Sequence, residues 1–467
     1  MGSGKQRDRG HPWRDNIEAV TVSIIIIVLF KYFVLEAYKI PTGSMQPTLM
    51  GWSDPNGGGI FDRVLVDKFS YHYRDPERYE VVVFKYPLDR SKNFIKRIVG
   101  MPGETLEIRD GDLFHARPGE DMKILRRPRP VQRTQLRLLE GSPEYSWRVD
   151  EGSWTTQLAQ ATGTGPGRIS FPSDPRGIRD HYTDGYPVKL AERVRSSGKG
   201  SGNNPVGDLR VEGVAAAAAD CTEIKLVLRE ASRVYTLTVP GPAASAEERP
   251  SIRVQDLRGS FADAQALAAK PWKLRAGDSV RVAGQNIDDL LELEIDGEVV
   301  VELEIGSVSN SNDAHVSIVT EGGGADLEDL QVHRDIYYTT ARQKYRRWQI
   351  PEGQYVMLGD NTQDSSDSRD WSLTRYSIPD GAGGEQVVRG NQRSQENPLR
   401  SFGPGGDATL YFRDELGELW IFDNRESRRL ESEAMSFVPR SLVRGRAVLV
   451  VWPIVPSLDV YRIQWVR

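Results

Sequence analysis

Two hydrophobic patterns follow one another along the chain. Near the N-terminus, "AVTVSIIIIVLFKYFVLEAYKI" (residues 19 to 40) carries an almost unbroken apolar run, interrupted by Lys31. Such a run is about long enough for a helix that crosses a hydrocarbon core of ~30 Å. Further along, apolar residues alternate with polar ones in short runs, which is typical of strands with one buried face. The pattern therefore predicts an N-terminal helix followed by a mainly β protein.

The apolar run has two interpretations. We expect residues 19–38 to be a transmembrane anchor, with residues 1–18 as a cytoplasmic tail, because basic residues precede the run and favour an inside N-terminus. Lys31 can extend its side chain to the membrane interface. The alternative is a cleaved signal peptide, which has a similar apolar segment. The anchor is favoured because no clear small-x-small cleavage site follows before Thr42.

Alternating segments after the anchor predict an antiparallel β unit. The segments are "DRVLVDKFSY" (62–71), "YEVVVFKYP" (79–87), "NFIKRIVG" (93–100) and "ETLEIRDGDLF" (104–114). Closely spaced turn residues separate them, which favours antiparallel pairing. Residues 39–114 are therefore expected to be the first part of a core, and the looser, Pro-, Gly- and Ser-rich residues 115–209 a variable insert with a flexible linker.

A second block of alternating segments, residues 210–340, predicts an inserted β-sandwich of six or more strands. Asp296-Gly297 lies between two alternating runs and is a dipeptide favoured in two-residue hairpin turns. The strand pattern resembles concanavalin-like or laminin-G-like sandwiches. "VAAAAADC" (214–221) predicts a spacer or a short helix.

Short strands return after residue 340. Residues 341–380 and 435–467 are expected to complete the core, and residues 381–434 to form a second, polar insertion.

Composition excludes several classes of function. The 467 residues carry a net charge of -5, so the chain lacks the basic footprint of a nucleic-acid-binding protein. Cys221 is the single cysteine, which excludes an internal disulfide and a Cys-rich zinc site. The six histidines show no metal-ligand spacing, and no metal site is expected.

A serine and a lysine are the first candidates for chemistry. Ser44 lies in "KIPTGSMQPTL" (39–49), and no GxSxG motif surrounds any serine. A lysine can act as its base if burial lowers the lysine pKa from about 10.4 by roughly two units. Lys96 has the apolar neighbours this requires. The alternative is that Lys96 and Arg97 are an ordinary charged pair on a strand edge.

The third candidate segment is "YVMLGDNTQDSSDSRDW" (355–371), a strand followed by a glycine and a polar loop. Asp367 and Arg369 are expected to form a bidentate pair that fixes this loop. A plain turn capped by its Asp, Asn and Ser side chains is the alternative.

In this order, "SMQPTL", "DRVLVDKF", "VVVFKYP", "FIKRIVGMPGE" and "GDNTQDSSDSR" resemble type I signal peptidases, the membrane-bound Ser-Lys proteases of the leader peptidase family. The resemblance implies an antiparallel β catalytic core that carries the sandwich as an insert. It implies Ser44 as nucleophile, Lys96 as general base, and Thr42 with the Ser44 backbone N–H as the oxyanion hole. It places Ser365, with Ser366 as the alternative, as the serine that orients the lysine. Supporting loop residues would be Asp360, Asp367 and Arg369. The candidates for the substrate pocket are Ile40, Met45, Phe94 and Ile95, although packing in the core explains each of them almost as well.

The function implied by the resemblance is removal of signal peptides from exported preproteins at small-x-small sites, without metal or organic cofactor. The expected partners are preprotein signal peptides and the lipid bilayer, and the expected location is a bacterial inner membrane with the catalytic part on the periplasmic side. The sandwich has two interpretations, a module that binds a glycan or another envelope partner and a spacer. Two other functions are alternatives to an active signal peptidase. One is a membrane-tethered binding protein on an inactive peptidase scaffold, and the other is a self-cleaving protease of the repressor type.

Overall fold

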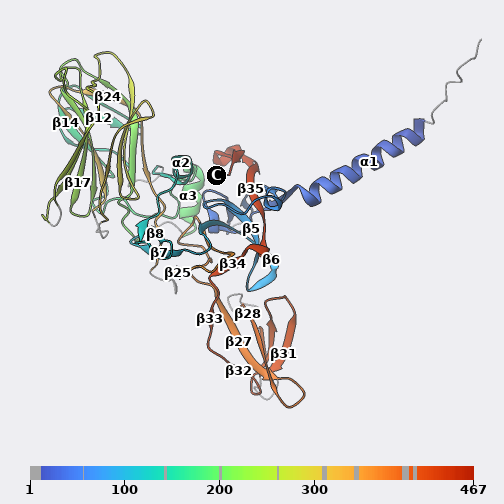
Figure 1. Ribbon diagram of the computed structural model, residues 1–467. Helices are drawn as coiled ribbons and strands as arrows, with labels where there is room; N and C mark the ends of the chain where they lie inside the picture. Colours follow the sequence, from blue (N-terminus) through green and yellow to red (C-terminus); the bar gives the residue numbers. More distant parts are fainter. Residues whose placement is uncertain are drawn as a thin grey trace, which may run out of the picture.

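The computed structural model describes residues 12–55, 57–140, 145–198, 202–259, 262–307, 313–340, 346–391, 399–402 and 408–466. Figure 1 shows a central β core, a large β-sandwich on one side of it, a smaller sheet region below it, and a long N-terminal helix that projects away. The chain is mainly β, as its alternating pattern predicts.

An eight-stranded sheet forms the core. Its order is β1-β4-β35-β5-β6-β26-β34, with β38 paired to β35, and neighbouring strands are antiparallel. The strands are β1 (Leu35–Lys39), β4 (Arg63–Asp67), β5 (Val81–Tyr86), β6 (Asp89–Gly100), β26 (Gln354–Leu358), β34 (Phe437–Pro439), β35 (Val443–Trp452) and β38 (Gln464–Trp465). The order places β6 between β5 and β26, so segments far apart in sequence lie side by side.

Smaller elements complete the core. A four-stranded sheet of order β25-β7-β8-β9 packs on it through an apolar cluster that includes Val99, Leu106 and Val356. The strands predicted within residues 62–114 are thus confirmed. The remaining elements are β7 (Thr105–Arg109), β8 (Asp112–Ala116), β9 (Lys123–Ile124), β25 (Arg347–Gln349), β2 (Gly51–Ser53), β3 (Gly59–Phe61), β36 (Ile454–Val455), β37 (Val460–Tyr461) and the 3₁₀ turns η1 (Gly43–Met45), η2 (Ser70–His72), η3 (Arg440–Leu442) and η4 (Pro456–Leu458).

The inserted sandwich consists of two antiparallel sheets. One has the order β12-β13-β24-β15-β20-β21-β22, with β10 paired to β24, and the other has the order β11-β14-β23-β16-β17-β18-β19. The strands are β10 (Arg137–Leu138), β11 (Arg148–Glu151), β12 (Trp154–Gln157), β13 (Gln160–Gly163), β14 (Gly167–Phe171), β15 (Leu209–Ala217), β16 (Glu223–Glu230), β17 (Arg233–Pro240), β18 (Ser251–Asp256), β19 (Ala264–Leu267), β20 (Val280–Ile287), β21 (Leu290–Ile295), β22 (Glu298–Glu304), β23 (His315–Glu321) and β24 (Ala325–Arg334).

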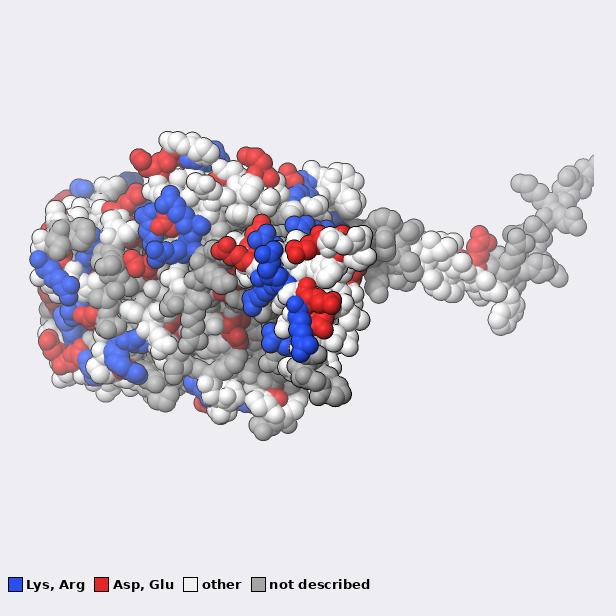
Figure 2. Space-filling model, turned by 90° about the horizontal axis from the view of Figure 1, so that it is seen from below, with Lys and Arg blue, Asp and Glu red and all other residues white. Residues whose placement is uncertain are grey.

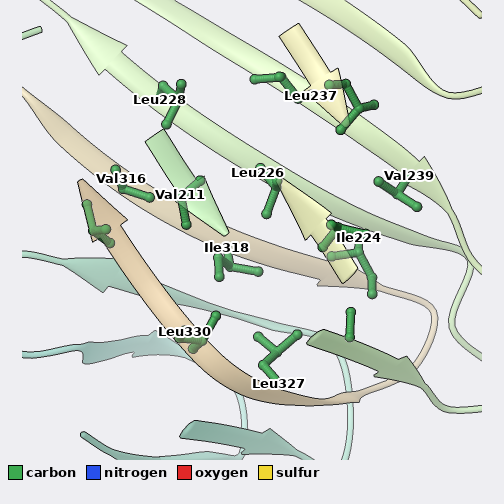
Figure 3. Close-up of a cluster of buried hydrophobic side chains, with 14 of the residues drawn as sticks. Val211, Ile224, Leu226, Leu228, Leu237, Val239, Val316, Ile318, Leu327 and Leu330 are labelled. Atoms are coloured by element: carbon green, nitrogen blue, oxygen red, sulfur yellow. The ribbon is translucent and has the colours of Figure 1, made fainter. Parts of the chain in front are cut away.

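Apolar side chains from both sheets fill the sandwich interior. Along β16, buried and partly exposed residues alternate strictly, so one face of the strand turns inward. Figure 3 shows Leu226 and Ile318 of one sheet packed with Val211 and Leu327 of the other, and all four are buried. The predicted hairpin turn at Asp296-Gly297 is confirmed between β21 and β22, and both turn residues have the positive φ that this turn requires.

The sandwich begins earlier than the predicted residue 210. Strands β11 to β14 lie within the predicted variable segment. Of these, β13 pairs with β24 and β14 pairs with β23, while β12 and β11 join the two sheets as the outer neighbours of β13 and β14. The partners of β13 and β14 follow more than 140 residues later in the chain, so no local pattern marked these strands as part of the sandwich. The alanine run, predicted as a spacer or helix, is strand up to Ala217, because pairing with β20 and β24 on both sides outweighs the helix propensity of alanine.

The chain between the two parts of the sandwich packs on the core. Helix α3 (Val188–Ser196) buries Leu190, Ala191 and Val194 against Trp52 and Ile60. Helix α2 (Arg129–Gln135) lies where the chain passes from the core to the sandwich. Much of the predicted linker is therefore an ordered connector between core and sandwich.

The second insertion is also larger than predicted. Strand β27 (Ser372–Pro379), expected in the core, pairs with β28 (Glu385–Asn391), β32 (Arg428–Arg429) and β33 (Glu433–Ala434). A three-stranded sheet of β29 (Leu399–Phe402), β30 (Ala408–Arg413) and β31 (Leu419–Asp423) adjoins it. Tyr376, Leu410 and Phe412 form a small apolar core of their own, so this region is more than a polar loop.

Helix α1 (Pro12–Phe33) ends earlier than the predicted anchor. Residues 35–39 are strand β1, whose backbone pairs with β4 and so cannot continue the helix to residue 38. Among the residues described, no helix is both long and apolar enough to cross a membrane. The first eleven residues of the predicted tail lie outside the described residues. Figure 2 shows the described surface of the projecting helix as largely uncharged.

Candidate active site

Ser44 lies in the 3₁₀ turn η1, just after strand β1. The turn is held in place because Ile40 before it and Met45 at its end are buried in an apolar cluster with Val64 and Val81. A backbone hydrogen bond from Gln46 N to the Gly43 carbonyl closes the turn at 3.1 Å. The serine is 7% exposed. The local sequence thus holds Ser44 at a defined place beside the core sheet.

Lys96 meets Ser44 from strand β6. Its Nζ donates to Ser44 Oγ at 2.5 Å and to the Ile95 carbonyl at 3.0 Å. Lys96 is 3% exposed, and burial lowers its pKa to about 8, against the opposing charges of Asp367 and Asp360. An amine with this pKa is partly neutral near neutral pH and can accept a proton from the serine. The two residues predicted as a pair from the sequence are therefore in contact.

Arg97, the next residue of β6, points away from Ser44 and is also buried. Its Nε and Nη2 donate to the two carboxylate oxygens of Asp360 at 2.9 and 2.7 Å. Thr48 Oγ1 donates to the same carboxylate at 2.6 Å. Burial alone would raise the pKa of Asp360, but the Arg97 guanidinium, together with Arg137 and the Thr48 hydroxyl, holds that pKa below its usual range. The alternative of an ordinary charged pair on a strand edge is wrong, because the side chains of Lys96 and Arg97 are both buried.

The loop after β26 is held by a second buried ion pair. Arg369 Nε and Nη2 donate to the Asp367 carboxylate at 2.9 and 2.7 Å, and both side chains are buried. The predicted bidentate pair is thus confirmed. Asp367 also accepts from the Gly359 backbone N–H at 3.0 Å, which ties the loop to the strand that precedes it. Burial alone would raise the pKa of Asp367, but the Arg369 guanidinium, together with the Gly359 N–H and Ser365, holds that pKa below its usual range.

Ser365 is buried next to Ser44 but does not touch the lysine amine in the described structure. Its Oγ makes no hydrogen bond of ordinary geometry, although it lies near enough to Asp367 to contribute to that group's lowered pKa. The hydrogen bond from Ser365 to Lys96 that the resemblance implies is therefore not formed here, since the loop turns this hydroxyl toward Gly359. Ser366, the alternative lysine partner, lines a groove beside Ser44 and Lys96.

Gly359 gives the loop its close approach to the serine. A Cβ on Gly359 would lie 2.1 Å from Ser365 Oγ and 2.4 Å from the Ser44 carbonyl oxygen. No side chain fits there without displacing one of the two segments. The glycine is therefore required by the packing of the loop on the nucleophile turn.

A groove of about 900 Å³ opens beside Ser44 and Lys96. Thr42, the predicted oxyanion donor, lies exposed on this groove, two residues before Ser44. Of the substrate-pocket candidates, Phe94 and Ile95 line the groove, whereas Ile40 and Met45 are core residues beneath the turn. The lining residues are Pro41, Thr42, Gly43, Ser44, Lys92, Asn93, Phe94, Ile95, Lys96, Gln363, Asp364, Ser365, Ser366 and Asp370.

Asn361 is a site residue that the sequence did not single out. Its Nδ2 donates to the Gly43 carbonyl at 3.0 Å and its backbone N–H donates to the Ser44 carbonyl at 3.2 Å. Asn361 therefore connects the polar loop to both residues at the nucleophile. Its place directly after Gly359-Asp360 was the available signal, but one polar residue among many in that loop does not stand out.

A carboxylate cluster lies away from the groove, where β8 of the core meets the sandwich. Oxygens of Asp112, Asp208 and Asp288 all lie within 4.8 Å of one another. Burial and the neighbouring carboxylates raise the pKa of Asp112 and of Asp208 well above the usual range. Arg127 pairs with Asp288 at 3.0 Å. Carboxylates are the ligands that hard cations prefer, but Arg127 already pairs with one of the three, and we assign no ion to the cluster.

Comparison with known proteins identifies the family. The sequence profile described as signal peptidase, peptidase S26, matches residues 13–137 and 275–382. These segments contain Ser44, Lys96 and the loop at 359–371, and the second also takes in β20 to β24 of the sandwich. The chain therefore belongs to the signal peptidase family, peptidase S26.

Three curated relatives illustrate the extent of the match. "Probable signal peptidase I-2" of Synechocystis sp. is 36% identical over 116 residues, which cover 24% of this chain and 49% of the relative. Signal peptidase I of Leptolyngbya laminosa is 29% identical over 144 residues, 29% of this chain and 59% of the relative. Signal peptidase I of Pseudomonas fluorescens is 38% identical over 95 residues, 18% of this chain and 30% of the relative. The chain thus spans about half the length of the first two relatives and less of the third.

Solved structures match at a lower level. The Emp47p carbohydrate recognition domain is 10% identical with a TM-score of 0.26, and covers 43% of this chain and 98% of its own. The VIP36 exoplasmic/lumenal domain is 11% identical with a TM-score of 0.28, and covers 44% of this chain and 93% of its own. TM-scores and sequence identities this low carry no argument about the sandwich.

Proposed function

We propose that the chain is a type I signal peptidase, a serine endopeptidase that removes signal peptides from exported preproteins. The single observation that carries the proposal is the 2.5 Å contact between Lys96 Nζ and Ser44 Oγ beside an open groove. Membership of the signal peptidase family gives this contact its chemical context.

The proposed reaction is acyl transfer through Ser44. Neutral Lys96 accepts the Ser44 proton, the serine oxygen attacks the scissile carbonyl carbon, and the C–N bond then breaks as the lysine returns the proton to the leaving amine. Water, deprotonated by the same lysine, hydrolyses the ester on Ser44. The Thr42 hydroxyl and the Ser44 backbone N–H are the proposed donors to the negatively charged oxygen. Each step uses a group of this chain and water.

The edge of strand β6 offers a place for the substrate backbone. In the described structure, β26 pairs with β6 only between Arg97 and Gly100, so the edge of residues 92–95 faces the groove. An extended peptide can add to such an edge through main-chain hydrogen bonds. Phe94 and Ile95 are then the proposed walls for the small side chains at a cleavage site. The Phe94 ring is held by stacking on Tyr86, with centroids 4.1 Å apart.

We further propose that the N-terminal helix attaches the chain to a lipid bilayer. Its support is the apolar run itself and the exposure of its side chains: Ile17, Val20, Val22, Ile24, Ile25 and Ile26 are 48–65% exposed, although they are apolar. Basic residues that precede the run favour a cytoplasmic N-terminus, with the groove on the opposite side. Because Ser44 follows Phe33 by eleven residues, its reach from the helix end is at most about 40 Å.

The test is cleavage of a preprotein by membrane vesicles that contain the full chain, after an alkaline carbonate wash. We expect the chain to stay in the pellet and to cut the preprotein after its small-x-small site, as identified by N-terminal sequencing of the product. A matched preprotein with tryptophan at the last signal-peptide position should stay uncut, because Phe94 and Ile95 are the proposed walls of a pocket for small side chains. Equal cutting of both preproteins would contradict the proposed specificity, and loss of the chain to the supernatant would contradict the membrane attachment.

The close packing at Gly359 gives a second expected result. Gly359→Ala should lower the cleavage rate by about 100-fold, because the new methyl group pushes Ser44 or Ser365 aside and a displacement near 1 Å costs about that factor. Gly165→Ala is the control, since a Cβ there meets no atom within 4 Å. Initial rates of preprotein cleavage compare the two variants. A rate for Gly359→Ala within twofold of the control would show that the loop does not position the serine.

Binding by the sandwich stays a prediction, and so does the spacer interpretation. A groove of about 1000 Å³ runs over the sheet that contains β16, β17 and β23. Several of its charged side chains already pair with one another, such as Arg229 with Asp313. Any search for a glycan has to use the full chain, because a fragment that starts at residue 210 would lack strands β11 to β14.

A further inference from the structure

The chain that connects the two parts of the sandwich contacts the nucleophile turn directly. Gln46, two residues after Ser44, is buried, and its Oε1 accepts hydrogen bonds from two tyrosines of the connector. Tyr182 donates to it at 3.1 Å, and Tyr186 donates to it as well. These tyrosines lie 136 and 140 residues after Gln46 in sequence. A segment of the insert thus supports the turn that carries the serine.

Tyr182 also lies against the other segments of the site. Its hydroxyl is 3.1 Å from Asp364 Oδ2, and Asp364 lines the groove beside Ser44. A Cβ on Gly43 would lie 2.9 Å from the same hydroxyl, so this oxygen packs against the residue before the nucleophile. Since a phenol has one proton, Tyr182 donates to Gln46 or to Asp364 at any moment. Its hydroxyl therefore lies between the nucleophile turn and the polar loop and hydrogen-bonds one of them at a time.

The sandwich holds this segment at its other end. Arg334, the last residue of β24, pairs with Asp184 at 2.5 Å and donates to the His181 carbonyl at 3.0 Å. Tyr145 donates to Asp184 at 3.0 Å. Arg334 and Asp184 are both buried, and breaking a buried pair leaves an uncompensated charge. Residues 180–186 are therefore fixed between the sandwich and the active-site groove.

We propose that residues 180–186 are a brace for the nucleophile, with Tyr182 and Tyr186 as positioning residues that act through Gln46. The inserted sandwich is then a structural part of the catalytic unit. This inference rests on the proposed peptidase function, because it concerns the same serine. Neither tyrosine lines the groove, so their effect falls on the placement of Ser44 and leaves substrate binding unchanged.

The test is the double variant Tyr182→Phe/Tyr186→Phe in the full chain. We expect kcat to fall by about 10- to 100-fold with KM within about twofold, because a misplaced nucleophile slows the chemical step. Hydrogen exchange in peptides that cover residues 42–49 should become faster. The control is Tyr235→Phe, which removes a buried hydroxyl that donates to Glu230 at 2.8 Å inside the sandwich. That variant should keep the wild-type kcat and the wild-type exchange at 42–49.

Three outcomes decide the inference. Unchanged kcat and unchanged exchange at 42–49 in the double variant would overturn the brace while leaving the peptidase proposal intact. An equal fall of kcat in Tyr235→Phe would also overturn it, because the effect would then be general destabilisation. Absence of cleavage by the wild type would refute the peptidase function, and the exchange measurement would still decide whether the connector holds the turn.

Discussion

Lys96→Met is expected to lower kcat for preprotein cleavage by about 10³-fold, a typical contribution of a general base. Methionine has a similar length, so it fills the buried space but cannot accept the Ser44 proton. Ser44→Ala should reduce the rate at least as far, since it removes the attacking oxygen. Steady-state rates with a purified preprotein measure both. Lys189→Met is the control, because Lys189 lies on α3, does not line the groove, has its side chain 56% exposed and should leave kcat unchanged.

The pH dependence tests the same lysine without substitution. Only neutral Lys96 accepts a proton, and its pKa is about 8. The cleavage rate should therefore rise about tenfold per pH unit below this value and level off above it. A rate that stays flat between pH 6 and pH 9, or a cleaving Lys96→Met variant, would mean that another group is the base.

The lowered pKa also fixes the sign of the stability effect. A lysine whose folded-state pKa lies below its unfolded value releases its proton on folding, so its contribution to stability rises with pH between about 8 and the unfolded value. Below this window the folded protein carries a charged amine in a buried site. Lys96→Met removes that charge, and the variant should unfold at neutral pH no more easily than the wild type.

Arg97→Met is expected to destabilise the core by about 3–5 kcal/mol, the usual cost of removing one partner of a buried ion pair. The side chains of Arg97 and Asp360 are each 1% exposed, so the Asp360 carboxylate would stay buried without its main partner. The arginine also donates to the Tyr79 carbonyl at 2.7 Å, a bond that methionine cannot replace. The core, the inserted sandwich and the second insertion need not unfold together. The suitable measurement is therefore hydrogen exchange in peptides of β5 and β6, which reports on the core alone.

Two further variants make this result specific. Arg347→Met removes an arginine whose side chain is 60% exposed and which lies 3.3 Å from Glu107, so it should cost no more than about 1 kcal/mol. Arg97→Met combined with Asp360→Asn should recover part of the loss, because the unpaired charge is then gone. Equal effects of Arg97→Met and Arg347→Met would show that the buried pair has no special role.

The core strands and the candidate site residues were predictable because their signals are local. Alternation of apolar and polar residues marks a strand within five or six positions, as in β4 and β7, and the apolar run of β5 is an equally local signal. Ser44, Lys96 and the polar loop each lie in a short punctuated segment. Helix α1 was predicted from its apolar run, but its end was not, because only the pairing of β1 with β4 stops the helix at Phe33.

The misplaced elements share a different cause. The alanine run forms a strand because β20 and β24 pair with it, and strands β11 to β14 join the sandwich through partners much later in the chain. Ile40 and Met45 were candidates for the substrate pocket, but their side chains are buried in the apolar cluster under the turn. In each case a distant segment decides the outcome, and a pattern within one segment cannot report it.

By itself, the sequence determined the mainly β character of this protein, the order of its core segments, and which serine and lysine to consider together. Only the tertiary structure decided that Lys96 is buried with its amine 2.5 Å from Ser44 Oγ, across 52 residues of sequence. It also decided that the connector supports Gln46 through Tyr182. The physical reason is that alternation and motif spacing are properties of neighbouring residues, whereas burial, a shifted pKa and a contact between remote side chains exist only once the sheets have packed.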